Sequence, residues 1–385
     1  MTLSLPSLAM PDAPPPEPTP QPSLDEFRRR IDDLDRRLID LLNERARLVV
    51  DVGRSKRASG VPVYAPHRES EVLSKVLSLN QGPLKPRTIE GIYREIMSGS
   101  FALERGLAIG YLGPAGSFSH LAAVRHFGQS VNFEDMGSIE GVFTGVARGH
   151  VDYGIVPIEN SLHGGVQETL DALIAFAGRV NVYAEVQLEV HHALAANCDP
   201  ARIARVYSKP EVFSQCRQWL ATKMPHAQQV PVASSSRAVQ MVAEESAKDS
   251  AAPVAAIGST LAAELYDVAI LFHAIEDNPN NITRFYVLSP QQAQRSGDDK
   301  TAIMFKTIDK PGALAAVLHD FERSGINLTH IDKRPAGRTN WTYTFFIDAQ
   351  GHQSDATMQL AIERAKQHCQ ELTVLGSFPR SRRIL

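Results

Sequence analysis

The amino-acid sequence predicts a multidomain protein, in which an all-α segment is followed by an α/β segment and then by a small α+β segment. Three observations support this division. Residues 24–105 place apolar side chains three and four positions apart and contain few glycines, as amphipathic helices do. Residues 106–290 alternate apolar, β-rich runs with helical stretches, and residues 300–385 follow the order β-α-β-β-α-β. A chain of 385 residues is long enough for two or three domains.

Composition narrows the class of protein further. The chain is 43% hydrophobic and 22% charged with a net charge of −3, which is typical of a soluble globular protein, and no apolar run approaches the length of a membrane span. Residues 1–23 contain eight prolines and no basic residue, which predicts a disordered tail rather than a signal peptide. The three cysteines are too few and too scattered for a disulfide framework or a metal site. We therefore expect a cytoplasmic protein that needs no metal ion.

One long helix is predicted at the start of the all-α segment. Gly60 and Pro62 end it, so that about 35 residues span roughly 50 Å. Two shorter helices, at about 67–80 and 86–104, follow and are too short to cover it, so we expect a homodimer or a higher assembly. The apolar stripe of the long helix consists of Phe27, Ile31, Leu34, Leu38, Leu41, Leu48 and Val52.

Polar residues interrupt the apolar stripes of all three helices. Arg45 takes the stripe position between Leu41 and Leu48, and Lys56 lies on nearly the same face. A carboxylate, Glu69, lies in the stripe of the second helix, and Ser100 and Glu104 share a face of the third. Because a buried charge needs a partner, these groups either satisfy one another, for example as an Arg45–Glu69 pair, or enclose a polar ligand. Several interruptions with two or more cations favour a site for a di-anion.

The segment from Leu24 to Glu104 resembles the all-helical type of chorismate mutase. The resemblance implies that cations hold the two carboxylates of chorismate, that a lysine contacts the ether oxygen, and that an arginine of the partner chain completes each site. A pericyclic rearrangement needs a compact substrate conformation and well-placed charge rather than a nucleophile. Arg28, on a different face from Arg45, suits the residue that reaches across a dimer. The matching positions are Arg28, Arg45, Lys56, Arg68, Glu69, Ser100 and Glu104.

Two positions depart from the mutase pattern. Ala65 stands where the family commonly has aspartate, and Glu104 stands where many members have glutamine. A glutamate must be protonated to donate a hydrogen bond to the ether oxygen, so we expect mutase activity to rise at mildly acidic pH. The alternative for this segment is a nucleic-acid-binding helical arm built on its arginines, but interleaved aspartates favour a solvated, salt-bridged face.

The α/β segment contains several strand–turn–helix units. In the first, Gly113, Pro114 and Gly116 allow a sharp turn, after which Ser117 or Ser119 can cap a helix. In the second, a strand to Val156 precedes a loop that carries Glu159, Asn160 and Ser161, and a third unit places Ser208 and Gln215 around a helix start. Because helix N-termini favour anions, we expect a carboxylate-binding pocket between such units.

A polar triplet precedes the last apolar strand of this segment. Arg284 can hold a carboxylate with two hydrogen bonds, beside the hydroxyl of Thr283 and the ring of Phe285. Such a triplet is also common at ordinary strand starts, so it carries no functional assignment alone.

Five strings in this segment, GPAGSFS, VPIENS, SKPEVFSQC, AAIGS and NITRF, together resemble prephenate dehydratase over residues 106–290. The resemblance implies a two-lobed α/β fold like that of periplasmic binding proteins, with lobes at 106–187 plus 277–290 and at 188–276. It implies that Thr283 acts near the departing hydroxyl. Arg284 and Phe285 would lie beside it, and the cleft would be lined by Glu159, Asn160, Ser161, Ser208 and Gln215. The alternative is a non-enzymatic amino-acid or carboxylate sensor joined to a helical dimerisation arm.

The α+β segment has the element order of a ferredoxin-like fold. It resembles an ACT domain, with PGAL for the family's loop and DKRP where dehydratases usually carry ESRP, so that Asp332 and Lys333 depart from the pattern. The resemblance implies that phenylalanine binds between two such domains and inhibits the enzyme; the alternative is a plain dimerisation module. The matching residues are Gly312, Ala313, Leu314, Asn327, Leu328, Arg334 and Pro335.

Taken together, these resemblances predict a bifunctional enzyme without metal or organic cofactor. It would convert chorismate to prephenate and prephenate to phenylpyruvate, under feedback inhibition by phenylalanine. Prephenate loses carbon dioxide and hydroxide as its ring becomes aromatic, so the protein needs mainly to assist departure of the hydroxyl and to bind two carboxylates.

Overall fold

The computed structural model describes residues 23–59, 62–250, 252–307, 310–335 and 343–385. The predicted proline-rich tail lies outside the described residues, apart from Ser23. The chain divides into two compact units, Met1–Asp51 and Val52–Leu385, so that the boundary falls within the first helix. The two units are described separately below.

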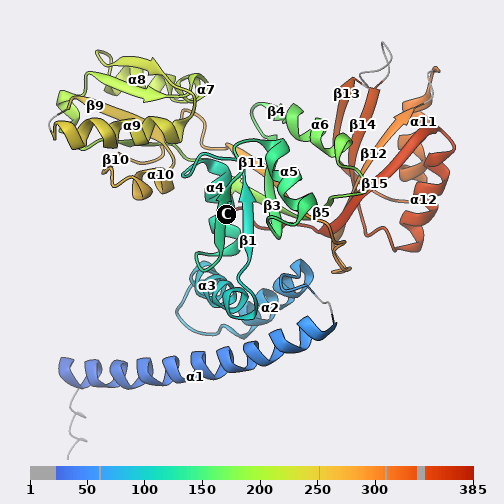
Figure 1. Ribbon diagram of the computed structural model, residues 1–385, viewed down its shortest axis with the longest axis horizontal. Helices are drawn as coiled ribbons and strands as arrows, with labels where there is room; N and C mark the ends of the chain where they lie inside the picture. Colours follow the sequence, from blue (N-terminus) through green and yellow to red (C-terminus); the bar gives the residue numbers. More distant parts are fainter. Residues whose placement is uncertain (1–22, 60–61, 251, 308–309, 336–342) are drawn as a thin grey trace, which may run out of the picture. The chain divides into compact units, whose positions relative to one another are not determined.

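The all-α segment forms three helices, and their bounds agree with the predicted ones to within about a residue. They are α1 (Leu24–Ser59), α2 (Pro66–Leu79) and α3 (Pro86–Glu104). Asp25 and Glu26 lie in the first turn of α1, where carboxylates are favoured, and a proline opens both α2 and α3. Figure 1 shows α1 as one continuous helix.

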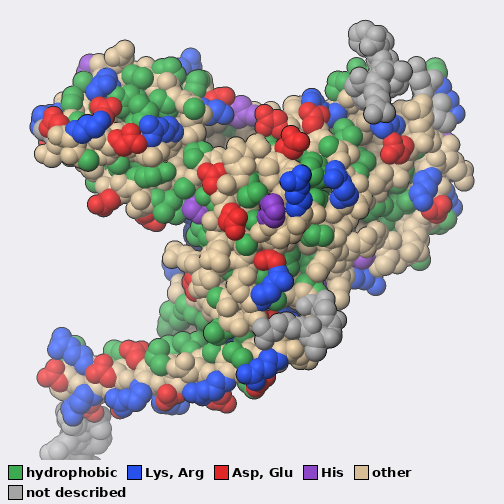
Figure 2. All heavy atoms as spheres, viewed as in Figure 1, with side chains coloured by type: hydrophobic (Ala, Val, Ile, Leu, Met, Phe, Trp, Pro, Cys, Tyr) green, Lys and Arg blue, Asp and Glu red, His purple; other side chains and the backbone are tan. Residues whose placement is uncertain are grey.

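The apolar stripe of α1 is exposed. Phe27, Leu34 and Leu48 keep 45%, 58% and 61% of their surface accessible, and the other stripe residues are similar. Figure 2 shows apolar side chains along α1 beside rows of basic and acidic ones. An amphipathic helix of this length with an exposed apolar stripe is typical of an assembly surface.

The first lobe of the α/β segment is built on a mixed sheet with the order β2-β1-β3-β11-β5. Strand β11 follows the second lobe in sequence, returns to the first, and pairs antiparallel with both β3 and β5. Helices pack on both faces of this sheet (Figure 1). The strands are β1 (Ala108–Tyr111), β2 (Asn132–Asp135), β3 (Tyr153–Asn160), β4 (Gly164–Gly165), which pairs with β3, β5 (Asn181–Glu189) and β11 (Ile282–Ser289); the helices are α4 (Phe118–Phe127), α5 (Ile139–Arg148) and α6 (Gln167–Ala175).

The second lobe has its own sheet, with the order β10-β6-β9-β7-β8. The chain enters this lobe after β5 and leaves it before β11, so two crossover segments join the lobes. The predicted two-lobed α/β architecture is therefore confirmed. Its strands are β6 (Ala193–Ala195), β7 (Arg205–Ser208), β8 (Gln228–Pro231), β9 (Val254–Gly258) and β10 (Ile270–Phe272); its helices are α7 (Pro210–Gln215), α8 (Arg217–Lys223), α9 (Ser235–Lys248) and α10 (Thr260–Leu265), with a 3₁₀ turn at Pro200–Arg202.

Strand β3 is longer than predicted. The sequence analysis ended it at Val156, yet it continues through Pro157 to Asn160. Its neighbour β1 pairs with it only as far as Ile155, while the antiparallel partner β11 continues alongside it. A proline, which has no N–H to donate, is tolerated where one side of a strand is not paired with a neighbour. The longer strand places Glu159 and Asn160 in the sheet rather than in a loop.

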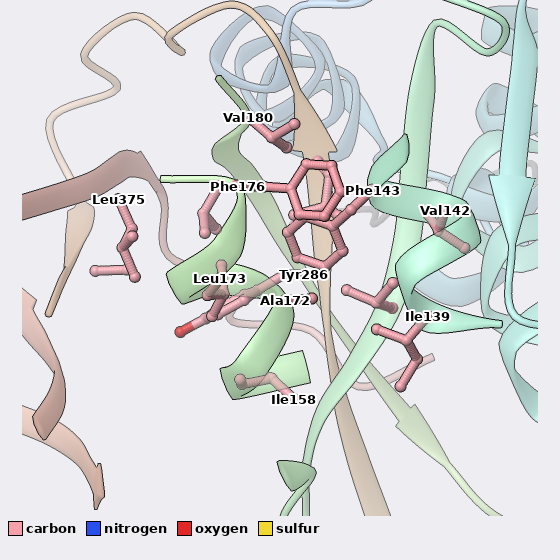
Figure 3. Close-up of a cluster of buried hydrophobic side chains, with 14 of the residues drawn as sticks. Ile139, Val142, Phe143, Ile158, Ala172, Leu173, Phe176, Val180, Tyr286 and Leu375 are labelled. Carbon is pink, nitrogen blue, oxygen red and sulfur yellow. The ribbon is translucent and has the colours of Figure 1, made fainter. Parts of the chain in front are cut away.

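The C-terminal domain has the predicted ferredoxin-like order, with a four-stranded antiparallel sheet arranged β13-β14-β12-β15. One sheet face packs on α11 and α12 and buries Phe305, Val317 and Ile362. The other face adds Phe346 and Leu375 to a core that also contains Tyr286 of the first lobe (Figure 3). The elements are β12 (Asp299–Thr307), α11 (Ala313–Arg323), β13 (Leu328–Pro335), β14 (Tyr343–Gln350), α12 (Ala356–Lys366) and β15 (Cys369–Pro379).

Three further properties of the fold bear on the sequence predictions. Among the described residues, no helix is long and apolar enough to cross a membrane, and no cluster of three or more histidine, cysteine or acidic side chains could hold a metal ion. The three cysteines are free thiols. Cys216 is buried in the core of the second lobe, and this burial raises the pKa of its thiol to about 12, as expected for a packing side chain rather than a nucleophile.

Candidate active sites and effector domain

The antiparallel pairing of β3 with β11 brings four of the predicted residues together. Thr283 lies opposite Asn160, and Arg284 lies opposite Glu159. Because successive strand residues point to opposite faces, these two cross-strand pairs occupy different faces of the sheet. The next two residues of β11 show the same alternation, because Phe285 packs in the core on one face of the sheet and Tyr286 in the core on the other.

On the face that carries Thr283 and Phe285, Asn160 orients the hydroxyl of Thr283. The amide Nδ2 of Asn160 donates to Thr283 Oγ1 at 2.9 Å and to Asn281 Oδ1 at 2.7 Å. Its Oδ1 accepts the backbone N–H groups of Leu162 and His163, which sets the orientation of the amide. A hydroxyl that accepts one hydrogen bond can still donate its own proton. Thr283 can therefore present an O–H group to a bound molecule.

Ser161 joins the same two strand ends. Its Oγ donates to the carbonyl of Asn280 at 3.2 Å and accepts the N–H of Ile282 at 3.0 Å. These bonds hold the turn after β3 against the start of β11. Ser161 therefore orders the backbone around Thr283. Phe285 is 1% exposed and packs in the core on the same face of the sheet as Thr283.

On the opposite face, Arg284 is surrounded by carboxylates. Its guanidinium donates to Glu159 at 2.7 Å, to Glu185 at 3.2 Å and to Asp348 of the C-terminal domain at 2.5 Å. Burial alone would lower the pKa of Arg284, but Asp348 and Glu185 outweigh it and raise that pKa. Strand alternation turns this guanidinium away from Thr283, so the structure does not bring Arg284 beside it as the sequence analysis expected.

Glu159 shares the Arg284 face. His330 Nδ1 of β13 lies 3.3 Å from its Oε2, and a hydrogen bond from His330, opposed by burial and reinforced by Arg284, lowers the pKa of Glu159 to about 2. The carboxylate is therefore ionised in neutral solution, and it is bound by Arg284 and His330 rather than directed into the Thr283 face.

The two predicted residues of the second lobe have different environments. Ser208 is buried, and its Oγ donates to the carbonyl of Ile257 at 2.8 Å, so that it joins β7 to β9. Gln215 Oε1 lies 2.6 Å from Nε2 of His192, in the crossover that follows β5. The N–H of His192 donates to Glu276, in the other crossover, at 2.8 Å. Gln215 is thus connected to both segments that join the lobes.

Two of the recognised strings meet where the lobes face each other. Ser259, from AAIGS, donates to the carbonyl of Gly116, from GPAGSFS, at 2.6 Å, and Ser236 of α9 donates to the carbonyl of Ala115. A Cβ at Gly116, where φ is +79°, would lie 2.8 Å from Ala262 Cα, so glycine is required there. Ser117, one of the two predicted caps, accepts the N–H of His120 and caps α4.

In the helical segment, Lys56 and Glu104 form a partly buried ion pair. Lys56 Nζ lies 2.9 Å from Glu104 Oε2, and the two side chains are 26% and 7% exposed. Gly53 allows this approach, because a Cβ there would lie 3.1 Å from Glu104 Cα. The structure thus brings together two predicted mutase residues that are 48 positions apart.

The remaining mutase candidates are distributed more widely. Glu69 forms a buried ion pair with Arg94, a residue the sequence analysis did not identify. Arg68 is exposed and pairs with Glu71 at 2.8 Å, and Ser100 Oγ donates to the carbonyl of Ile96. Within the first unit, Arg28 is exposed and pairs with Asp25, and Arg45 is half-buried.

The residues predicted for phenylalanine lie on the C-terminal domain around the start of α11 and along β13. Gly312 has φ +81° and precedes α11, where Ala313 is buried and Leu314 is half-buried. The backbone carbonyl of Asn327 accepts the N–H of Gln350, and Leu328 and Pro335 are the ends of β13. Arg334 lies on the same strand, but its guanidinium binds α6 of the first lobe, with Nε donating to Asp171 at 2.6 Å.

Family models match nearly the whole described chain. The model of chorismate mutase type II covers residues 27–105, that of prephenate dehydratase covers 109–293, and that of the ACT domain covers 301–367. The bifunctional chorismate mutase/prephenate dehydratase of Stutzerimonas stutzeri is 40% identical over 365 residues, which is 93% of this chain and 98% of the relative. The enzyme of the same name from Aquifex aeolicus is 36% identical and is covered to 98%.

The chain belongs to the bifunctional chorismate mutase/prephenate dehydratase family.

Solved structures agree with this family. A prephenate dehydratase from Arthrobacter aurescens, in complex with L-Phe, is 31% identical with a TM-score of 0.65, over 71% of this chain and 90% of that one. The prephenate dehydratase of Staphylococcus aureus is 28% identical with a TM-score of 0.61, over the same share of this chain and all of that one. The predicted fold class is thereby confirmed.

The bifunctional enzyme therefore carries two activities, as predicted: it rearranges chorismate to prephenate and converts prephenate to phenylpyruvate. The alternative of a sensor that does no chemistry is wrong.

Several residues of these sites were missed by sequence reasoning. Glu185 and Asp348 each interrupt an apolar strand, in VYAEVQL and FFIDA, and a carboxylate in such a run is a signal that a buried cation lies nearby. Arg94 in IYREIM is a similar signal for Glu69. The sequence around His330 and Glu276 gives no such signal, because their partners come from other elements and are brought close only by tertiary packing.

Proposed function

We propose that Thr283, oriented by Asn160, is the group of the dehydratase site that acts on the departing hydroxyl of prephenate. The observation that carries this proposal is the 2.9 Å hydrogen bond from Asn160 to Thr283, which leaves the threonine proton available to a substrate oxygen. A donor at that position stabilises the negative charge that develops on the leaving oxygen. Thr283 is a poor acid, so we assign it hydrogen-bond donation rather than full proton transfer.

The other predicted dehydratase residues take supporting roles in this proposal. Ser161 and Phe285 hold the Thr283 strand from its two sides, and Ser208 and Gln215 fix the second lobe and its crossovers. Glu159 and Arg284 act from the opposite sheet face. An assay that follows phenylpyruvate absorbance after addition of prephenate tests the activity, and the same assay from chorismate tests both steps.

For the mutase, we propose that Lys56 and Glu104 contact the ether oxygen of chorismate. Their mutual distance of 2.9 Å supports this, because one small substrate atom can reach both groups. Arg45, Arg68, Glu69 and Ser100 would bind the carboxylates and hydroxyl, and Arg28 would come from the partner chain. This part of the proposal rests on the resemblance, and replacing Arg45 tests it.

We also propose that the enzyme is at least a homodimer through α1. The exposed stripe, with Ile31 at 56% and Leu38 at 55%, gives the apolar surface that a second copy would cover. Sedimentation equilibrium measures the assembly. Replacing Leu34 and Leu38 together by glutamate should yield monomers without mutase activity, whereas a protein that stays dimeric would contradict the role of α1.

We propose that phenylalanine binds the C-terminal domain at an interface between two such domains and inhibits the dehydratase. The relative from Arthrobacter aurescens was solved with L-Phe, and Gly312, Ala313, Leu314, Asn327, Leu328, Arg334 and Pro335 match the pattern. Titrating phenylalanine against the dehydratase rate tests this. No response at millimolar phenylalanine would favour a plain dimerisation module.

The domain boundaries and location are proposals as well. We propose domains at 24–105, 106–290 and 300–385 after a tail at 1–23, and the family models at 27–105, 109–293 and 301–367 support this division. We propose a cytoplasmic enzyme, where thiols such as Cys198 and Cys369 stay reduced. Limited proteolysis and cell fractionation test these two statements.

A further inference from the structure

The C-terminal domain contributes two side chains to the dehydratase sheet. Asp348 of β14 accepts hydrogen bonds from the guanidinium of Arg284 at 2.5 Å and from the hydroxyl of Tyr286 at 2.7 Å. His330 of β13 lies 3.3 Å from Glu159 Oε2. Arg284 and Glu159 in turn bind each other across β3 and β11. We call the set Asp348, Arg284, Glu159 and His330 the interdomain clamp.

Three of the four side chains of the interdomain clamp are buried, whereas that of Glu159 is 34% exposed. The side chains of Asp348, His330 and Arg284 are 1%, 6% and 14% exposed. Beneath them Glu185 is also buried and is bound by Arg284 and by Lys300 of β12, whose Nζ lies 2.9 Å from it. Removing one partner from such a set leaves the other charge unpaired in a low-dielectric environment, so a shift of either domain has to be followed by the other.

The strand register connects the clamp to Thr283. The Arg284–Glu159 pair is the next cross-strand pair after Thr283–Asn160, and the register shifts between Arg284 and Phe285. The irregularity is confined to the β3 side, because β11 keeps its register with β5 from Ile282 to Val287. On the β3 side the ladder is interrupted, so the contact between the side chains of Arg284 and Glu159 helps to hold the two strands together there. Because peptide units are rigid, a displacement of Arg284 also displaces Thr283.

The strand that carries His330 also carries part of the proposed effector site. Leu328, Arg334 and Pro335 lie on β13, and Arg334 additionally binds Asp171 and Gln167 at the start of α6. A displacement of Arg334 or Pro335 at the end of β13 would therefore be transmitted to α6 of the first lobe through the direct contacts of Arg334 with Asp171 and Gln167.

We propose that Asp348 and His330 are positioning residues of the dehydratase site, which act through Arg284 and Glu159 on the Thr283–Asn160 pair, and that the interdomain clamp transmits the state of the effector domain to that pair. This inference rests on the proposed roles of Thr283 and of phenylalanine. It replaces the expected role of Arg284 as a ligand of substrate carboxylate with a link between domains.

The test uses the full chain and measures both activities of each variant. Asp348→Asn keeps the size of the side chain but removes its charge, and we expect the dehydratase kcat to fall about tenfold, with the KM for prephenate changed less than threefold. Phenylalanine should still bind by calorimetry but inhibit less. Mutase turnover should stay within twofold, which serves as an internal control for folding. The matched control is Asp320→Asn, a buried carboxylate that pairs with His368 of its own domain.

A second variant covers the case in which Asp348→Asn does not fold and loses both activities. Tyr286→Phe keeps the aromatic ring and removes only the hydroxyl that binds Asp348, so we expect a few-fold loss of kcat or a shift in the half-inhibitory phenylalanine concentration. The inference is overturned if the folded variants keep both quantities within twofold of the wild type, or if the change is confined to KM. A wild type that phenylalanine does not inhibit overturns the effector proposal instead, and the kcat comparison still decides the positioning role.

Discussion

Asn160 donates a hydrogen bond to Thr283 Oγ1 at 2.9 Å, across two strands that are 123 positions apart in sequence. The same amide is held from its other end by the backbone of the turn after β3. Orientation of the threonine hydroxyl is therefore established before substrate binds, and preorganised donors of this kind stabilise developing charge without paying for reorganisation. The dehydratase chemistry should therefore depend on this contact as well as on the charged groups of the Arg284 face.

Replacing Thr283 by alanine should abolish dehydratase activity, with a loss of at least about a hundredfold in kcat, because the donor to the leaving oxygen is removed. Mutase turnover in the same preparation should be unchanged. Thr283→Ser, which keeps the hydroxyl, is the matched control and should retain most of the activity. An equal loss of both activities in Thr283→Ala would instead indicate unfolding.

Asn160→Asp should lower the dehydratase kcat about tenfold, the effect of losing one hydrogen bond worth about 1.4 kcal/mol in the transition state. The new carboxylate keeps the acceptor for the N–H groups of Leu162 and His163 but cannot donate to Thr283. Repulsion of a dianionic substrate would raise KM, so steady-state kinetics separates the two effects. A change in KM with kcat intact would contradict the orienting role of the amide.

Much of the fold could be predicted because local signals decide it. The three helices were predicted to within about a residue, since their apolar periodicity is long and Gly60 and Pro62 mark the end of the first. The end of β3 was predicted wrongly: a proline usually interrupts a strand, yet β3 continues through Pro157 to Asn160. A proline is tolerated where the neighbouring strand on one side has already ended, as β1 has before Pro157. Where the neighbouring strand ends is a property of the sheet and cannot be predicted from the local sequence.

The site was predicted less completely than the fold. The resemblance grouped Thr283, Arg284 and Phe285 as one motif, yet adjacent strand residues point to opposite faces and therefore have different partners. The alternation of side chains along a strand could have predicted that Arg284 faces away from Thr283 and Phe285. It could not have predicted which residues bind Arg284. Glu185 and Asp348 are 99 and 64 positions from Arg284, and their contacts exist only after the C-terminal domain has packed on the first lobe.

Arg45→Leu should reduce mutase activity by about 10- to 100-fold, the cost of losing charge-assisted hydrogen bonds to a substrate carboxylate. Dehydratase activity with prephenate should be unaffected. Arg47→Leu is the matched control, because Arg47 is exposed two positions further along α1. If isomerisation of chorismate proceeds at the wild-type rate in Arg45→Leu, the polar residues in the helical stripes serve assembly and not a ligand.

Glu104→Gln should raise mutase activity at neutral pH and make it less dependent on pH. An amide donates a hydrogen bond to the ether oxygen at any pH, whereas a carboxyl group donates only when protonated. The variant also releases Lys56 from an ion pair at 2.9 Å. Rates measured from pH 5 to 8 decide this: the wild type should be faster at the acidic end, and a wild-type rate that is flat over this range would contradict the assignment.

Glu159 should make the folded protein sensitive to acid. Its pKa is lowered from 4.5 to about 2 by the hydrogen bond from His330 and by Arg284, so its ionised form is favoured in the folded state. A lowered carboxyl pKa contributes stability that is fully present above about pH 4.5 and is lost progressively as the pH falls to about 2. Thermal unfolding of the wild type and of Glu159→Gln should therefore show a lower Tm for the variant at pH 7, and a difference that shrinks between pH 4.5 and 2. A difference that stays constant over this range would mean that the glutamate acts through its shape and not through its charge.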